Sequence, residues 1–108
     1  MNIRMDYLYR DAGNYKNWGE VVFSNPSHLP LNHIEKMATE ALLERMYFIA
    51  SSVGLPNLHF PECNAALDHD WHEFHGLAET DAPVSDSGGR SVEQWIEGLQ
   101  SQSIGRIR

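Results

Sequence analysis

The chain has 108 residues, 42% of them hydrophobic, and a formal net charge of −7 at pH 7. This length and apolar share predict a single folded domain over residues 1–108 and exclude a disordered chain. Because 15 acidic residues outnumber 8 basic ones, the surface is expected to repel phosphate backbones, and no nucleic-acid partner is expected.

The expected location follows from patterns that the sequence lacks. Cys63 is the one cysteine, so an internal disulfide cannot form. No apolar run is long enough to cross a bilayer, and the polar N-terminus has no signal-peptide pattern. We therefore expect a soluble, cytoplasmic protein without a membrane partner.

Two β-rich stretches at the start of the chain predict a β-hairpin. Apolar and polar residues alternate over residues 3–10, which is the two-residue period of a strand with one buried face. Residues 20–24 form a second β-rich run, and Asn25-Pro26 ends it. Residues 11–14 have the composition of a turn, because Gly and Asn adopt positive φ at low cost.

A long helix is the most clearly patterned element of the sequence. Asn32, with Glu35 three residues later, is close to a capping box, and apolar residues follow at helical spacing. Arg45 interrupts this apolar stripe. Gly54 is a stop signal, because glycine adopts the left-handed conformation that ends many helices. We therefore predict a helix of about five or six turns over residues 32–53.

Two shorter β-stretches are predicted after this helix. Residues 57–61 can form a short strand that carries Leu58 and Phe60. Residues 67–77 are ambiguous between strand and helix, and their aromatic content favours a strand.

The last third of the chain predicts a loop, a helix and a tail. Residues 79–90 are rich in Ser, Gly and acidic residues and predict a mobile loop. Ser91 and Gln94 form a capping-box signature that opens an apolar helical face. Residues 101–108 have little pattern and are expected to fray.

The expected fold is α+β with the element order ββαββα. It has a small antiparallel sheet of three or four strands, packed against one long and one shorter helix. Placing both helices on one face of the sheet buries both apolar helical stripes at once.

The loop between the first two strands is the best candidate for a binding site. It combines aromatic rings, cations and amides, namely Tyr9, Arg10, Asn14, Tyr15, Lys16 and Trp18. Aromatic rings stack on a nucleobase, and cations form charge-assisted hydrogen bonds with phosphates. We therefore predict a non-enzymatic protein that binds a small nucleotide-derived ligand. The simpler alternative is a solvated loop with one or two aromatic rings folded back on the core.

A run of histidines offers a second kind of site. His69, His72 and His75, with carboxylates at Asp70 and Glu73, have the side chains that divalent ions prefer. On a strand, however, His69 and His75 lie about 20 Å apart and His72 points to the other face. We therefore predict no metal, no cofactor and no catalytic residue. A metal-dependent hydrolase that uses this cluster remains an alternative.

The acidic residues are distributed unevenly. Residues 62–97 contain nine acidic residues and one basic residue, Arg90. This asymmetry offers another alternative function, an acidic interaction module or inhibitor that binds a basic partner. Tyr47 and Phe48 lie off the main stripe of the predicted long helix, and exposed apolar groups beside a full stripe favour a homo-oligomer.

The start of the chain resembles a known family. Tyr9-Arg-Asp-Ala-Gly-Asn-Tyr-Lys16, followed by Gly19-Glu-Val-Val-Phe-Ser-Asn25, is similar to the N-terminal part of small phage and bacterial proteins. Among these are the phage anti-Thoeris sponges, which sequester cyclic ADP-ribose signals without cleaving them. The resemblance implies an oligomeric, non-enzymatic phage counter-defence protein that buries a nucleotide signal between subunits. The resemblance does not assign a ligand-binding role to any residue of this chain.

Overall fold

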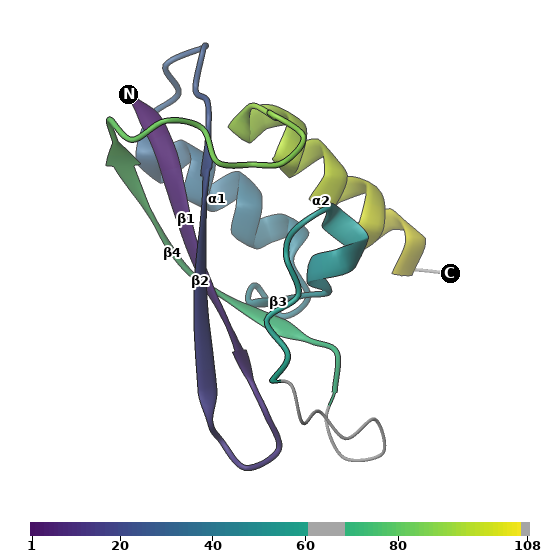
Figure 1. Ribbon diagram of the computed structural model, residues 1–108. Coiled ribbons are helices and arrows are strands. Elements are labelled where there is room, and N and C mark those ends of the chain that lie inside the picture. The colour runs from purple at the N-terminus through teal and green to yellow at the C-terminus, as the bar shows by residue number, and fades with distance from the viewer. Residues whose placement is uncertain (61–68, 107–108) are drawn as a thin grey trace.

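The computed structural model describes residues 1–60 and 69–106. Its elements in chain order are β1 (Asn2–Arg10), β2 (Lys16–Phe23), α1 (Leu31–Ala41), β3 (Tyr47–Phe48), the 3₁₀-helix η1 (Ala50–Val53), β4 (His72–Thr80) and α2 (Val92–Arg106). Figure 1 shows α1 and α2 side by side on one side of the sheet. The predicted α+β class, with a four-stranded antiparallel sheet and two helices, is confirmed.

The sheet has the strand order β2-β1-β4-β3, and each neighbouring pair is antiparallel. The β1–β2 hairpin predicted from the sequence is therefore present. A bulge interrupts the pairing of β1 with β4: Asp6 pairs with Gly76, whereas the next residue, Tyr7, pairs with Phe74. His75 is the extra residue in β4, and a bulge of this kind changes the direction in which a side chain points.

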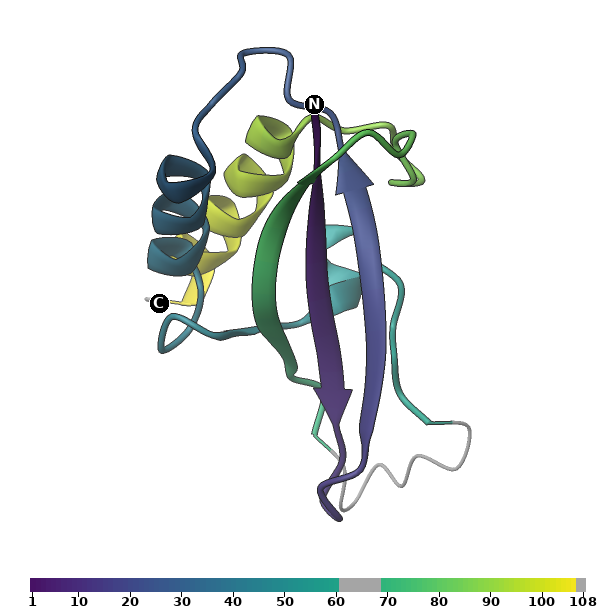
Figure 2. The ribbon, with the colours of Figure 1, turned by 90° about the vertical axis from the view of Figure 1, so that its left-hand side faces the viewer.

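The two faces of the sheet have different surroundings. Ile3 and Met5 of β1 point toward the helices, and Arg4 and Asp6 point to the opposite side, because side chains alternate along a strand. We call these sides the inner face and the outer face. Figure 2 shows the long strands from the outer face, with no helix in front of them. The inner face carries the core, which includes Ile3, Met5, Tyr7, Val21, Phe23, Ile34, Ala38, Phe48, Phe74, Trp95, Ile96 and Leu99.

The predicted helix over residues 32–53 is wrong beyond the end of α1, which has 11 residues. The chain then turns at Glu44 and Arg45, whose φ angles are 51° and 62°. After this turn, Phe48 of β3 is buried against Tyr7, with ring centroids 5.7 Å apart. The apolar residues at helical spacing are therefore buried by several different elements, and tertiary packing overrides the local helical pattern.

Of the two predicted capping boxes, only the second is formed. The Ser91 N–H donates to Gln94 Oε1 at 2.9 Å, and the Gln94 N–H donates to Ser91 Oγ at 3.2 Å. At the start of α1, Asn32 Oδ1 instead accepts a hydrogen bond from the adjacent His33 N–H. Pro30 is the residue that precedes this helix, with no side-chain cap.

α2 is the longer helix, with 15 residues, which reverses the predicted order of lengths. It extends to Arg106, so residues 101–106 of the tail that was expected to fray are helical. Its Trp95 is fully buried and stacks on Phe23, with ring centroids 5.0 Å apart. In the described parts of the chain, no helix is long and apolar enough to cross a membrane.

The strand predicted over residues 57–61 is absent as far as residue 60, and residue 61 lies outside the described residues. Side chains from the strands hold this segment in place instead. The Tyr7 hydroxyl donates to the Pro56 carbonyl at 2.7 Å, and Asn17 Nδ2 donates to the Leu58 carbonyl at 3.0 Å. The segment is therefore fixed without sheet pairing of its own.

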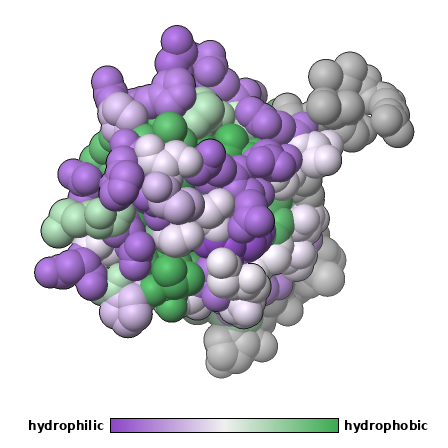
Figure 3. Space-filling view, turned by 90° about the horizontal axis from the view of Figure 1, so that it is seen from above, coloured by the Kyte–Doolittle hydropathy of each residue, from purple (hydrophilic) through white to green (hydrophobic). Residues whose placement is uncertain are grey.

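The strand predicted over residues 67–77 is present as β4, which begins five residues later and extends to Thr80. Residues 67 and 68 lie outside the described residues. The loop that follows, predicted to be mobile, is tied to the edge of β2. The Ser85 N–H donates to the Val22 carbonyl at 3.0 Å, and Ser85 Oγ accepts from the Val22 N–H at 2.8 Å. Seen from above, this end of the molecule is mostly hydrophilic, with hydrophobic residues in small patches (Figure 3).

Candidate functional site

A row of side chains crosses the outer face of the sheet. Leu8 of β1 pairs with Trp18 of β2 and with Glu73 of β4, and Glu73 pairs with Tyr47 of β3. Residues that pair directly across neighbouring strands have their side chains on the same face. These four side chains therefore lie next to one another on the outer face of the sheet. In Figure 2 no helix of the described residues lies in front of this face.

The first pocket on this face surrounds Trp18, and we call it the Trp18 pocket. It has a volume of about 500 Å³ and is lined by Asp6, Trp18, Gly19, Glu20 and His75. The indole of Trp18 is 53% exposed and meets the His75 ring edge to face, with centroids 4.9 Å apart. The bulge in β4 supplies His75, so this contact depends on an irregularity that the sequence pattern does not reveal.

Arg4 organises the acidic side of the Trp18 pocket. Its Nε lies 3.1 Å from Asp6 Oδ1 and 3.8 Å from Glu20 Oε2. The two carboxylates therefore share one guanidinium, which holds them close together beside the tryptophan.

Of the six residues that the sequence predicts as a ligand site, Tyr9 is on the opposite face of the sheet from Trp18. Tyr9 points to the inner face, is 1% exposed, and donates its hydroxyl hydrogen to the His69 carbonyl at 2.8 Å. Its ring contacts those of His59, His69 and His72. Tyr9 is therefore part of a buried aromatic cluster, on the opposite face from Trp18.

Arg10 is on the outer face, but its guanidinium already has partners. Nε lies 2.8 Å and Nη2 3.2 Å from the two carboxylate oxygens of Glu73, and Nη1 donates to Asn14 Oδ1 at 2.6 Å. The hydrogen bonds to Glu73 raise the pKa of Arg10 above its ordinary value. A phosphate would have to compete with Glu73 for this cation.

The remaining predicted residues lie at or near the tip of the hairpin. Asn14 adopts a φ of 67° in the turn, and Tyr15 is 72% exposed. Lys16 is exposed and begins β2, two residues before Trp18, so the two side chains share the outer face. The sequence predicts Lys16 and Trp18 to be loop residues, but the structure places both on β2.

The histidine run does not form a common site. His72 is 1% exposed: its Nε2 accepts a hydrogen bond from the Leu58 N–H at 3.0 Å, and its Nδ1 lies 3.2 Å from the Asp70 carbonyl. His75 is on the outer face, and His69 Nδ1 accepts from the Trp71 N–H. Among residues 1–60 and 69–106, no group of three side chains is placed to hold a metal ion.

Some of the acidic residues in the predicted acidic region are neutralised. Asp86 is 8% exposed, and its Oδ1 lies 2.9 Å from Arg90 Nη2. Hydrogen bonds from Arg90 lower the pKa of Asp86 below its ordinary value. Glu73 is bound to Arg10 in the same way. An acidic interaction surface would therefore lack these two charges.

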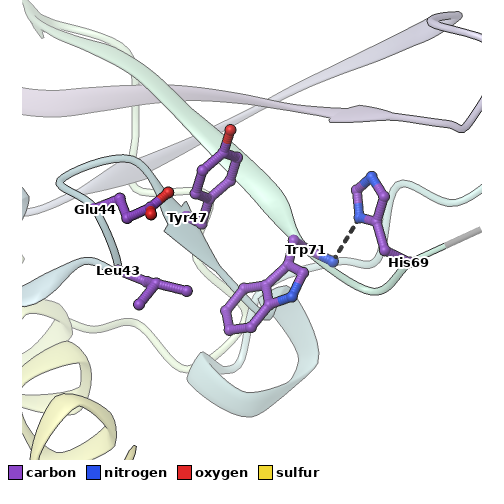
Figure 4. Close-up of a pocket in the computed structure, with 5 residues that line it drawn as sticks. All are labelled: Leu43, Glu44, Tyr47, His69 and Trp71. Atoms are coloured by element: carbon purple, nitrogen blue, oxygen red, sulfur yellow. Dashed lines mark hydrogen bonds between the residues drawn. The ribbon is translucent and has the colours of Figure 1, made fainter.

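A second pocket was missed by the sequence reasoning, and we call it the Trp71 pocket. It has a volume of about 400 Å³ and is lined by Leu43, Glu44, Tyr47, His69 and Trp71 (Figure 4). Leu43 and Glu44 belong to a stretch predicted to be helical, so no pattern placed them beside Trp71. The interruption of the apolar stripe at Arg45 was the one available signal.

No family model, no curated protein and no solved structure matches this chain. The function is therefore inferred from the geometry of the pockets and from the residues that line them.

Proposed function

We propose that the protein is a non-enzymatic binding protein that holds a small nucleotide-derived ligand in the Trp18 pocket. The proposal rests on the half-exposed indole of Trp18, which lies beside a pocket of about 500 Å³ on the uncovered face of the sheet. This volume is typical of small-molecule sites. An exposed tryptophan face in such a position offers a stacking surface for a nucleobase.

The polar residues around the pocket suit the other parts of a nucleotide. The carboxylates of Asp6 and Glu20 accept hydrogen bonds from ribose hydroxyls or from amino groups of a base. Lys16 lies about 7 Å from Trp18 along the strand, and its ammonium group can meet a phosphate. Arg4 is already paired with both of these carboxylates, so Lys16 is the cation that this proposal assigns to the phosphate.

For the biological role, the proposal draws on the resemblance of residues 9–25 to the anti-Thoeris sponges. That resemblance supports a cyclic nucleotide-type signal as the ligand and phage counter-defence as the role. Sequestration requires tight binding and no reaction. In a homo-oligomer, a second copy that faces the outer face would cover the open pocket and bury the ligand.

Isothermal titration calorimetry with cyclic ADP-ribose isomers and cyclic dinucleotides tests this function. We expect one of these ligands to bind and Trp18→Leu to weaken its binding roughly tenfold, because base stacking on an aromatic ring contributes about 1–3 kcal/mol. Tyr15→Leu is the matched control, since Tyr15 is exposed but does not line the pocket. No heat with any of these nucleotides would contradict the proposal.

A further inference from the structure

We propose that the Trp71 pocket is a second binding site, which takes a small molecule with a trimethylammonium group. Among the residues that the structure describes, this pocket shares no lining residue with the Trp18 pocket. Figure 4 shows Leu43 and Glu44 on one side, Tyr47 and Trp71 in the middle, and His69 on the other side of Trp71. The site therefore combines two large aromatic rings, a carboxylate and an aliphatic side chain.

This combination matches the chemistry of an organic cation. The faces of tryptophan and tyrosine rings attract a cation through their quadrupoles, and cages of aromatic side chains recognise quaternary ammonium groups. Leu43 is 37% exposed at the pocket and offers an apolar contact for the methyl groups. A trimethylammonium group is both charged and apolar at its surface, so it satisfies the rings and the leucine together.

The charges at the pocket favour a cation over an anion. Glu44 lines the pocket, and within the described residues its carboxylate has no lysine or arginine partner. No lysine or arginine is among the described residues that line the pocket. The net charge of −7 adds a weak attraction for cations over a longer range.

The turn that carries Glu44 at the pocket has a backbone conformation that is rare for residues with a side chain. Glu44 and Arg45 both have positive φ, and the Met46 N–H donates to the Leu43 carbonyl at 3.0 Å to close the turn. Residues other than Gly, Asn and Asp rarely adopt this conformation, and such strain concentrates at functional sites. The turn closes an antiparallel bridge between Leu43 and Tyr47, and Tyr47 in turn pairs with Glu73 of β4.

The opposite wall is also held in position. The Trp71 N–H donates to His69 Nδ1 at 3.0 Å, which closes a short turn before β4. Tyr47 is fixed by its pairing with Glu73 in the sheet. The backbone that carries each ring of the proposed cage is therefore held in place.

Calorimetric titration of the full chain with choline, and separately with 3,3-dimethylbutan-1-ol, tests the proposal. The alcohol has the same shape as choline, with carbon in place of the charged nitrogen, so the comparison isolates the charge. We expect choline to bind at least tenfold more tightly than the alcohol. Equal affinity for the two, or no binding of choline, would overturn the proposal.

Two substitutions test whether choline binds in the Trp71 pocket. Trp71→Leu should weaken choline binding at least tenfold, and Glu44→Gln should weaken it about threefold. Glu44 is exposed, so its substitution leaves folding intact and keeps the test valid if Trp71→Leu proves unstable. Trp18→Leu is the matched control and should leave choline binding unchanged, which also separates this site from the nucleotide site. Unchanged binding in both Trp71→Leu and Glu44→Gln would refute the assignment.

The trimethylammonium group could instead come from a methylated lysine of a protein. A short peptide that contains trimethyllysine distinguishes this source from a small molecule. We expect the peptide to bind no more tightly than choline, because the open pocket is built for one cationic group. Binding of the peptide at least tenfold more tightly than choline would overturn the small-molecule assignment.

Discussion

His72 is a buried side chain whose hydrogen bonds require a neutral ring. Its Nε2 accepts from the Leu58 N–H, so this nitrogen carries no proton, and the proton on Nδ1 points to the Asp70 carbonyl. Protonation would add a hydrogen to Nε2 and break the bond to Leu58. Burial also disfavours the charged ring, and it lowers the pKa of His72 below the ordinary value of 6.5.

We therefore expect the free energy of unfolding to fall as the pH decreases below 6.5. In this range the unfolded chain binds a proton at His72 and the folded chain does not, so acidification favours unfolding. Above this range the ring is neutral in both states, and its contribution is constant. Urea unfolding at about pH 7.5 and about pH 5.5 measures the effect.

Two variants test whether His72 is responsible. His72→Gln should flatten the dependence of stability on pH, whereas His33→Gln should retain it because His33 is exposed on α1. The same pH dependence in the wild type and in His72→Gln would show that another group titrates.

The candidate site shows which residue-level inferences the sequence supports. Trp18 lies in β2, where it pairs with Leu8, and its side chain is half-exposed on the outer face. Tyr9 belongs to the alternating set of Ile3, Met5 and Tyr7, so the same two-residue period already placed it on the buried face. The pairing of Arg10 with Glu73 could not be predicted, because the two residues are 63 positions apart in the chain.

At the scale of elements, the turn at Glu44 and Arg45 offers a test of local strain. Glycine adopts a φ of 62° without a steric penalty, whereas arginine does not. We expect Arg45→Gly to raise the free energy of unfolding by about 0.5–1 kcal/mol. Arg45→Ala is the control, since alanine keeps the strain. Equal stability of the two variants in urea unfolding would show that the turn is not strained.

The loop before α2 depends on an ion pair. Asp86 accepts hydrogen bonds from the Arg90 backbone and guanidinium, and Arg90 also donates to the Val53 carbonyl at 2.7 Å. We expect Asp86→Asn to lower the free energy of unfolding by about 2 kcal/mol, because the partly buried guanidinium loses its counter-ion. Asp81→Asn, in an exposed position of the same loop, should change stability little.

The pH dependence of this effect follows from the lowered pKa of Asp86. The stabilisation is present above the ordinary pKa of 3.8 and is lost as the pH falls through the lower pKa of the folded state. Urea unfolding near pH 7 measures the full difference between the wild type and Asp86→Asn. A difference no larger than that of Asp81→Asn would contradict the role of the ion pair.

The elements that were predicted correctly are those specified by residues close to one another in the sequence. The β1–β2 hairpin follows from alternation and a turn, and the start of α2 follows from Ser91 and Gln94. The helix over residues 32–53 was wrong because helical spacing of apolar residues does not reveal which element buries them. Phe48 is buried against Tyr7 and His72, which are distant in the chain, and only the folded structure brings these side chains together.

At the scale of the whole molecule, folding and binding use opposite faces of one sheet. The inner face buries the core, and the outer face carries the row from Trp18 through Leu8 and Glu73 to Tyr47. Trp18 at one end lines the Trp18 pocket, and Tyr47 at the other lines the Trp71 pocket. Side chains on paired strands are held more rigidly than those on loops, so a ligand in the Trp18 pocket would meet a preformed surface.

The hydrogen bonds between Ser85 and Val22 limit the pairing of this sheet with a strand of another molecule. β2 is an edge strand of the sheet. The free edge of such a strand is a template to which another chain can add a strand, and this leads to aggregation. Ser85 occupies both the amide and the carbonyl of Val22, so an incoming strand finds no partner there. The loop before α2 therefore protects this end of the sheet edge against aggregation.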